Sequence, residues 1–251
     1  MVGVQPLDTS WSLGAASLAS PADRCGIDCE DLEIHVVLSL TLVRHGQTEF
    51  NAQQRLQGWC DSPLTTSGRA GVRTTAARLA SRPFVAAFVS PSGRALATAR
   101  EILAFHPSVR LTVDPDLREF GFGDFEERLE SELYQRYDPE QLYPQVLAGT
   151  FAGLPGGESG GAFVRRVTAA FDRIEHEHGH GDVLVVSHGL ALRAYLTGID
   201  PRPTAPLPNA SVSEVDVHPG GRRRVVALAL DYAGHGAPGE VGLALAPALA
   251  I

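Results

Sequence analysis

Apolar and polar residues alternate along the chain in blocks that predict strands and helices in turn. The stretch IHVVLSLTLV, residues 34–43, is almost continuously apolar, which is typical of a strand buried on both faces of a parallel sheet. Similar runs predict further strands at 84–90, 111–114, 182–187, 211–218 and 223–231. Apolar residues at helical spacing predict helices at 65–82, 92–105, 157–178 and 189–198. This order predicts a three-layer α/β/α sandwich, in which helices cover both faces of a central, mostly parallel sheet.

The two ends of the chain lack this pattern. Residues 1–32 are rich in Ser, Ala, Gly, Pro and Asp and predict a flexible N-terminal extension, while residues 234–251 are biased to Gly, Pro and Ala and predict a loosely packed tail. Between them, residues 33–233 form one predicted domain. Within it, the stretch 115–157 is less regular, with scattered aromatic residues and prolines.

Composition narrows the class of protein. Hydrophobic residues make up 44% of the 251 residues and charged residues 20%, so the chain can bury a sizeable core. The net charge of −8, from 29 acidic and 21 basic residues, argues against a nucleic-acid or anionic-membrane partner. No apolar run approaches the roughly 20 residues that span a bilayer, and the N-terminus does not resemble a secretory signal. We therefore expect a cytoplasmic protein.

The cysteines fit the same expectation. Cys25, Cys29 and Cys60 are few and odd in number, which suits a reducing compartment better than a disulfide framework. Cys25 and Cys29 could pair or bind a metal, but without a second pair of thiols nearby the zinc signal is weak. The sequence assigns no role to any of the three.

Polar side chains follow three of the predicted strands at the point where each strand ends. Arg44 and His45 follow the first strand, Arg94 lies four residues beyond the second, and His188 follows the strand at 182–187. Because the carboxyl ends of parallel strands meet at one edge of a sheet, these side chains are expected to converge there. Arginine forks match phosphate oxygens, and Glu119, after the third strand, is a candidate general acid. Taken alone, His45 remains open to a capping or metal-binding interpretation.

Six segments carry a more specific resemblance. They are LVRHGQTEFN, RLQGWCDSPLTTSGRAGV, SPSGRALATA, LREFGFGDFE, PGGES and VVSHG, and together they run from about residue 36 to residue 230. In this order and spacing they resemble the motifs of the histidine phosphatase superfamily, in particular its phosphoglycerate-mutase-like branch. The resemblance implies the α/β/α sandwich of that branch.

The resemblance also implies roles for individual residues. His45 would be the nucleophile that becomes a phosphohistidine, and Glu119 would be the acid and base. Phosphate would be bound by Arg44, Arg94, Asn51, Gln57, His188 and Gly189. Phe122, Phe125 and Glu158 would lie at the substrate pocket, although Phe122 and Phe125 are as consistent with the core. The basic His188 contributes both to catalysis and to phosphate binding in this interpretation.

The expected activity is a metal-independent phosphatase that hydrolyses a small phosphomonoester without a cofactor. No metal is required, because guanidinium groups neutralise the phosphoryl charge. The alternatives are a cofactor-dependent phosphoglycerate-type mutase and a non-catalytic protein that binds a phosphometabolite. The mutase is disfavoured because 120–157 lacks the arginine-rich insertion that holds a substrate carboxylate, with only Arg128 and Arg136 in it. Since relatives commonly dimerise, a homodimer is a further expectation.

Some features depart from the family pattern or allow a simpler interpretation. Relatives often carry Trp-Glu-Gly where this chain has Phe125, Glu126 and Glu127, so the substrate size is open. The alternating histidines of HEHGH, residues 176–180, could bind a metal, but a frayed helix end is the favoured interpretation. Arg193 could touch the substrate or form a structural ion pair.

Overall fold

The computed structural model describes Met1 and residues 38–201 and 205–234. Residues 2–32 of the predicted N-terminal extension, with Cys25 and Cys29, and residues 235–251 of the predicted tail lie outside the described residues. No helix in the described part of the chain is long and apolar enough to cross a membrane.

The described domain contains a six-stranded sheet with the strand order β3-β2-β4-β1-β5-β6. Its strands are β1 (Leu38–Arg44), β2 (Phe84–Val89), β3 (Leu111–Val113), β4 (Gly181–Ser187), β5 (Val212–Val217) and β6 (Arg223–Leu230). The first four run parallel to one another, β5 runs antiparallel to β1, and β6 pairs antiparallel with β5. The prediction of a mostly parallel sheet is confirmed.

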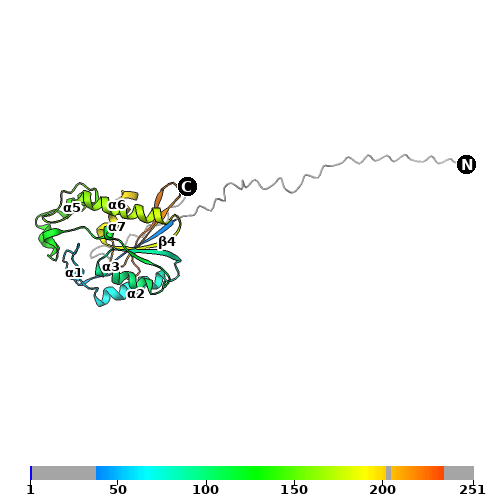
Figure 1. Cartoon of the computed structure of the whole chain (residues 1–251), viewed down its shortest axis with the longest axis horizontal. Coiled ribbons are helices and arrows are strands. Elements are labelled where there is room, and N and C mark those ends of the chain that lie inside the picture. The colour runs from blue at the N-terminus through cyan, green and yellow to red at the C-terminus, as the bar shows by residue number, and fades with distance from the viewer. Residues whose placement is uncertain (2–37, 202–204, 235–251) are drawn as a thin grey trace. The chain divides into compact units, whose positions relative to one another are not determined.

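Helices cover both faces of this sheet. α2 (Thr66–Leu79) and α3 (Gly93–Leu103) lie on one face, and α6 (Gly160–Glu177) and α7 (Gly189–Ile199) lie on the other (Figure 1). The irregular stretch after β3 holds 3₁₀ turns at Pro115–Leu117 and Gly123–Phe125, followed by α4 (Glu130–Tyr134) and α5 (Pro139–Leu147). A short α1 (Glu49–Ala52) follows β1. The three-layer sandwich expected from the sequence is therefore present.

Side-chain caps set where the helices begin. The hydroxyl of Thr65 accepts a hydrogen bond from the Gly68 N–H at 2.8 Å, and the hydroxyl of Ser159 accepts one from Ala162 at 3.2 Å. Because Ser159 is the N-cap, α6 begins at Gly160, three residues after the predicted start. The cap, rather than the apolar stripe, decides this boundary.

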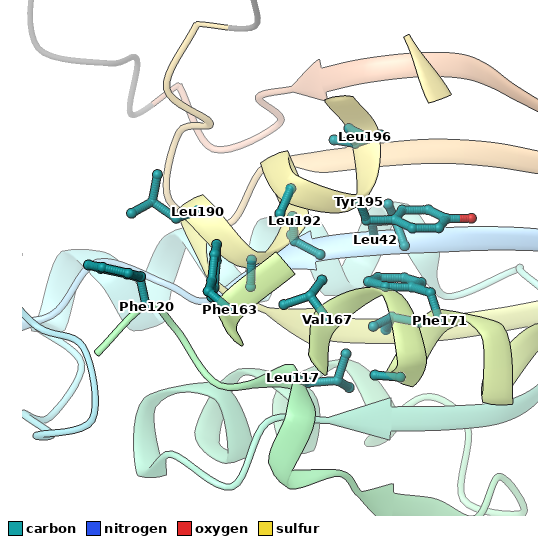
Figure 2. Close-up of a cluster of buried hydrophobic side chains, with 14 of the residues drawn as sticks. Leu42, Leu117, Phe120, Phe163, Val167, Phe171, Leu190, Leu192, Tyr195 and Leu196 are labelled. Atoms are coloured by element: carbon teal, nitrogen blue, oxygen red, sulfur yellow. The ribbon is translucent and has the colours of Figure 1, made fainter. Parts of the chain in front are cut away.

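The larger hydrophobic cluster lies between the sheet and the α6–α7 layer (Figure 2). Phe163 and Phe171 of α6 are completely or almost completely buried in it. The ring of Phe171 stacks on that of Tyr195 in α7, with 3.7 Å between centroids. Burial of such aromatic pairs contributes about 2–3 kcal/mol per side chain. This packing fixes α7, and with it the end of β4, against the sheet.

The strand order also places the candidate chemistry. β2, β4 and β1 are neighbours, so the residues that follow them lie side by side at the same edge of the sheet. This arrangement brings together segments that are more than a hundred residues apart in the sequence.

Candidate active site

His45 is the first residue after β1, and its side chain is buried with 4% exposure. Its Nδ1 lies 2.8 Å from the carbonyl oxygen of Gly46. Since a carbonyl oxygen can only accept, Nδ1 must carry the proton. In the neutral ring, Nε2 then keeps an unprotonated lone pair, which is the state that a nucleophile requires.

The surroundings keep this imidazole neutral. Burial lowers the pKa of His45 well below its usual value, and the positive charges of Arg94 and Arg44 lower it further. Hydrogen bonding to Gly46 acts in the opposite direction but is the smallest of these effects. His45 is therefore a neutral base at physiological pH.

His188 is the N-cap residue of α7 and is completely buried. Its ring lies edge-on to that of His45, with 5.2 Å between centroids. His188 Nε2 lies 2.7 Å from the hydroxyl oxygen of Ser90, the first residue after β2. Burial and the charge of Arg94 lower the pKa of His188 well below its usual value, so this ring is neutral as well.

Arg44 and Arg94 supply the positive charge of the site. The Arg94 side chain is fully buried and donates to the carbonyl oxygens of Cys60 and Gly58, each at 2.8 Å, and to the Asp61 carboxylate at 3.0 Å. Arg44 donates to the Leu207 carbonyl. Burial lowers the pKa of both arginines, but an arginine starts so high that both groups keep their charge.

Three buried polar atoms in this site have no hydrogen-bond partner among the described residues. They are Nε of Arg44, Nε of Arg94 and Nδ1 of His188. A buried donor without a partner is costly, so such atoms are expected to meet a ligand. Two guanidinium N–H groups and an imidazole nitrogen match the oxygens of a phosphoryl group.

Glu119 caps the helix that His188 begins. Its Oε1 accepts from the backbone N–H groups of Phe120 and Ala191 at 2.9 and 3.1 Å, and its Oε2 accepts from Leu190 at 3.0 Å. Oε2 thus accepts fewer of these bonds and keeps a lone pair that can carry a proton. A Cβ added at Gly189 would lie 3.5 Å from Arg44 Nε and 3.7 Å from Glu119 Oε2, so both the guanidinium and the carboxylate lie close to this glycine.

The structure ties Asn51 and Gln57 to the same loops. The Asn51 Oδ1 accepts from Thr48 N and from Asn209 Nδ2, both at 3.2 Å, and Asn209 also donates to the carbonyl of His45 at 3.1 Å. Gln57 is buried and bonds Thr48 and Ser62 through its side chain at 2.8 and 3.1 Å. Sequence reasoning missed Asn209, because nothing in its surroundings, LPNAS, marks it as part of the site.

Two further residues that the sequence did not single out hold the loops in place. The carboxylate of Glu126 accepts from the backbone N–H groups of Gly58, Trp59, Cys60 and Phe122 at 2.8 to 3.2 Å. Glu126 therefore holds the N–H side of the loop whose carbonyls bind Arg94. The sequence offers no signal for this role, because the bonds of Glu126 reach a loop 66 to 68 residues away.

Arg166 is the second such residue. It forms a two-pronged ion pair with Glu158, with both contacts at 2.7 Å, and donates to the carbonyls of Asp116, Arg118 and Glu119 at 2.6 to 2.8 Å. Glu158 thus lies beneath the Glu119 segment, bound to a partner on α6. Arg166 lies three residues after Phe163 and next to Val167, both of which belong to the buried face of α6. This spacing could have indicated that the Arg166 side chain faces the protein interior.

The remaining predicted positions lie in different surroundings. Phe122 and Phe125 are buried in the larger hydrophobic cluster, where Phe122 meets the ring of Phe120 edge-on. The His178 ring packs edge-on against Phe88, and no group of three potential metal ligands occurs among residues 38–201 and 205–234. Burial lowers the pKa of Arg193 and the charge of Glu119 raises it, which puts this arginine within electrostatic range of the site.

Comparisons with known proteins identify relatives of the whole domain. The model of the histidine phosphatase superfamily (branch 1) matches residues 40–230. A probable phosphoglycerate mutase GpmB from Yersinia enterocolitica is 36% identical over 186 residues, which cover 72% of this chain and 85% of that protein. A phosphoglycerate mutase from Bacillus anthracis superposes with a TM-score of 0.68 at 27% identity, covering 79% of this chain and 96% of the other. A mycobacterial glucosyl-3-phosphoglycerate phosphatase gives 0.66 at 25% identity, covering 77% and 99%.

Proposed function

The chain belongs to the histidine phosphatase superfamily, and we propose that it is a metal-independent phosphatase that hydrolyses a small phosphomonoester through a phosphohistidine at His45. One observation carries this proposal. His45 is buried and neutral, with Nδ1 bound to the Gly46 carbonyl, so its Nε2 lone pair is available beside the charges of Arg44 and Arg94.

The first step follows from this arrangement. The Nε2 lone pair attacks phosphorus, and the bond between phosphorus and the leaving oxygen breaks on the opposite side. The free lone pair of Glu119 Oε2 carries the proton that the leaving oxygen takes up. Arg44, Arg94 and His188 Nδ1 stabilise the negative charge on the three equatorial oxygens.

The second step returns the enzyme to its starting state. Glu119, now ionised, removes a proton from a water molecule as the water oxygen attacks the phosphohistidine. The phosphorus–nitrogen bond breaks, inorganic phosphate leaves, and the electron pair returns to Nε2 of His45. Since Gly46 keeps Nδ1 protonated throughout, the ring does not need to change tautomer between turnovers.

The phosphoglycerate-type mutase is the second candidate, because a relative at 36% identity carries that name. The segment 120–157 favours hydrolysis instead. The side chains of Arg128 and Arg136 lie over the ring of Phe125, 5.8 and 5.5 Å from its centroid. The charge of Glu130, like that of Glu119, raises the pKa of Arg44, so Glu130 is the second carboxylate near this arginine. Two negative charges there would disfavour a substrate with a carboxylate of its own, such as phosphoglycerate.

The test is phosphate release from a panel of phosphorylated metabolites and from p-nitrophenyl phosphate, with and without EDTA. We expect turnover that EDTA does not abolish. In His45→Ala the rate should fall by about 10³-fold or more, as is usual when a covalent nucleophile is removed, while the matched variant His176→Ala, on the exposed end of α6, retains activity. Undiminished turnover in His45→Ala would refute the proposal, and turnover that depends on a bisphosphorylated primer would favour the mutase.

A further inference from the structure

Ser90 is a completely buried polar residue that follows β2, and the mechanism above gives it no part. Its hydroxyl oxygen lies 2.7 Å from Nε2 of His188. The next polar neighbour of this hydroxyl, the oxygen of Ser92, lies 3.5 Å away. A distance of 2.7 Å is typical of a strong hydrogen bond, whereas 3.5 Å is at the limit of one. The bond to His188 therefore dominates the surroundings of the Ser90 hydroxyl.

The state of His188 depends on the direction of this bond. A neutral imidazole carries one proton, on either Nδ1 or Nε2. If Ser90 donates, Nε2 is the acceptor and the proton is on Nδ1. If Ser90 accepts, the proton is on Nε2 and a lone pair remains on Nδ1.

Nδ1 of His188 is the nitrogen that is left for a ligand. It is buried and has no hydrogen-bond partner among the described residues. Phosphoryl oxygens only accept hydrogen bonds, so an Nδ1 lone pair would repel the substrate, while an Nδ1–H group would bind it. The first arrangement described above is thus the one that fits a phosphate ester.

We propose that Ser90 is a positioning residue, whose hydroxyl donates to His188 Nε2 and thereby keeps the imidazole proton on Nδ1, where it can bind a phosphoryl oxygen. This inference rests on the proposed function, since it concerns the same site. Ser90 contacts no reacting atom in this role. It acts through His188 alone.

A hydroxyl is suited to this task because it carries no charge. Burial, Arg94, His45 and Arg44 all lower the pKa of His188 and keep it neutral. A carboxylate partner at Nε2 would favour the doubly protonated, charged ring and would add a negative charge next to the phosphate. Serine fixes the tautomer without either consequence.

The tautomer can be read directly by ¹⁵N NMR of the histidine rings in the substrate-free protein, with the His188 signals assigned from their loss in His188→Asn. We expect a protonated Nδ1 and an unprotonated Nε2 in the wild type. In Ser90→Ala the proton should redistribute to Nε2. The rate constant kcat for phosphate release should fall by about 10- to 100-fold with a smaller change in KM, because loss of the correct histidine tautomer impairs the transition state most.

Three further variants separate positioning from packing. Ser90→Thr retains the hydroxyl and should restore both the tautomer and kcat relative to Ser90→Ala. Ser90→Cys approximately retains the side-chain volume but offers a weaker donor. It replaces Ser90→Ala should that variant fail to fold, and it should show the same redistribution of the proton and a lower kcat. Ser92→Ala is the matched control, because its hydroxyl is 3.4 Å from His188 Nε2 and should matter little.

A protonated Nε2 in the wild type, or an unchanged tautomer in Ser90→Ala, would overturn the inference. The measurement is independent of turnover. If His45→Ala kept full activity, the proposed function would fail while the His188 tautomer could still follow Ser90.

Discussion

The two halves of the candidate site are built in different ways. The half at the strand ends contains Arg44, His45 and His188, each within one residue of the end of β1 or β4. The covering half is the segment 115–158. In it the backbone carbonyl of Glu119 accepts hydrogen bonds from the side chains of Trp59 and Arg166, which lie 60 and 47 residues away in sequence. The ends of two strands therefore place the residues that we propose to bind the phosphoryl group, whereas hydrogen bonds between residues distant in sequence hold the segment that we propose to meet the leaving group.

The largest effect expected in the covering half comes from Glu119→Gln. If this carboxyl protonates the leaving oxygen, its loss should lower kcat by about 10²- to 10⁴-fold for an alkyl phosphate. The loss should be much smaller for p-nitrophenyl phosphate, whose leaving group departs without a proton. Comparing the two substrates in one variant separates acid catalysis from misfolding, and an equal loss on both would argue against the acid role.

A second effect concerns the ion pair beneath the same segment. Arg166→Met leaves the Glu158 carboxylate, whose side chain is 8% exposed, without its partner. Removing one member of a buried pair costs about 3–5 kcal/mol of unfolding free energy. The double variant Glu158→Leu with Arg166→Met should be less destabilised in urea denaturation than Arg166→Met. If the single variant loses no stability, the ion pair does not hold this half of the site together.

The two buried histidines of the strand-end half should make the free energy of unfolding depend on pH. His45 and His188 have pKa values lowered well below 6.5 in the folded protein by burial and by the neighbouring arginines. Below pH 6.5 the unfolded chain therefore binds more protons, and the free energy of unfolding falls as the pH falls. The slope is up to about 1.4 kcal/mol per pH unit for each histidine, until the folded-state pKa is reached.

This slope can be measured by denaturant unfolding between pH 7 and pH 5.5. His45→Asn and His188→Asn should each reduce it, while His176→Gln, at an exposed position, should leave it unchanged. A wild-type slope that neither variant alters would show that these rings titrate normally in the folded state.

The smallest expected effect lies at Glu127, where relatives often carry glycine. Glu127 has a φ of +64°, in the left-handed region that an L-residue adopts at a cost of about 1–2 kcal/mol. Glu127→Gly should relieve this strain and raise stability by about 0.5–1 kcal/mol, after allowance for the freedom that glycine adds to the unfolded chain. Glu127→Ala serves as the control and should give no such gain in thermal unfolding.

The sequence predicted the half of the site that follows the strands and much less of the covering half. Apolar runs located β1, β2 and β4, and the polar residues that follow them could be placed at one sheet edge because parallel strands share a direction. The hydrogen bonds of Glu126 join a loop some 66 to 68 residues away, and no periodicity encodes such a contact. Arg166 and Asn209 were missed for the same reason, since folding brings close the backbone carbonyls and side chains to which they donate.

Phe122 and Phe125 illustrate the limit of composition. An aromatic residue in a glycine-rich loop could line a pocket or enter the core, and the two outcomes have the same local sequence. Here both rings enter the cluster around Phe120 and Phe163. Glu130, in the same segment, is instead close enough for its charge to raise the pKa of Arg44.

The central claim is that His45 is the nucleophile, and trapping the covalent intermediate tests it most directly. Wild-type protein should be mixed with a rapidly reacting phosphomonoester, quenched in base to preserve phosphohistidine, digested and analysed by mass spectrometry. We predict one phosphoryl group, labile to acid, on the peptide that contains His45, and none in His45→Ala. A phosphoryl group on another residue, or rapid turnover without any phosphorylated peptide, would contradict the account.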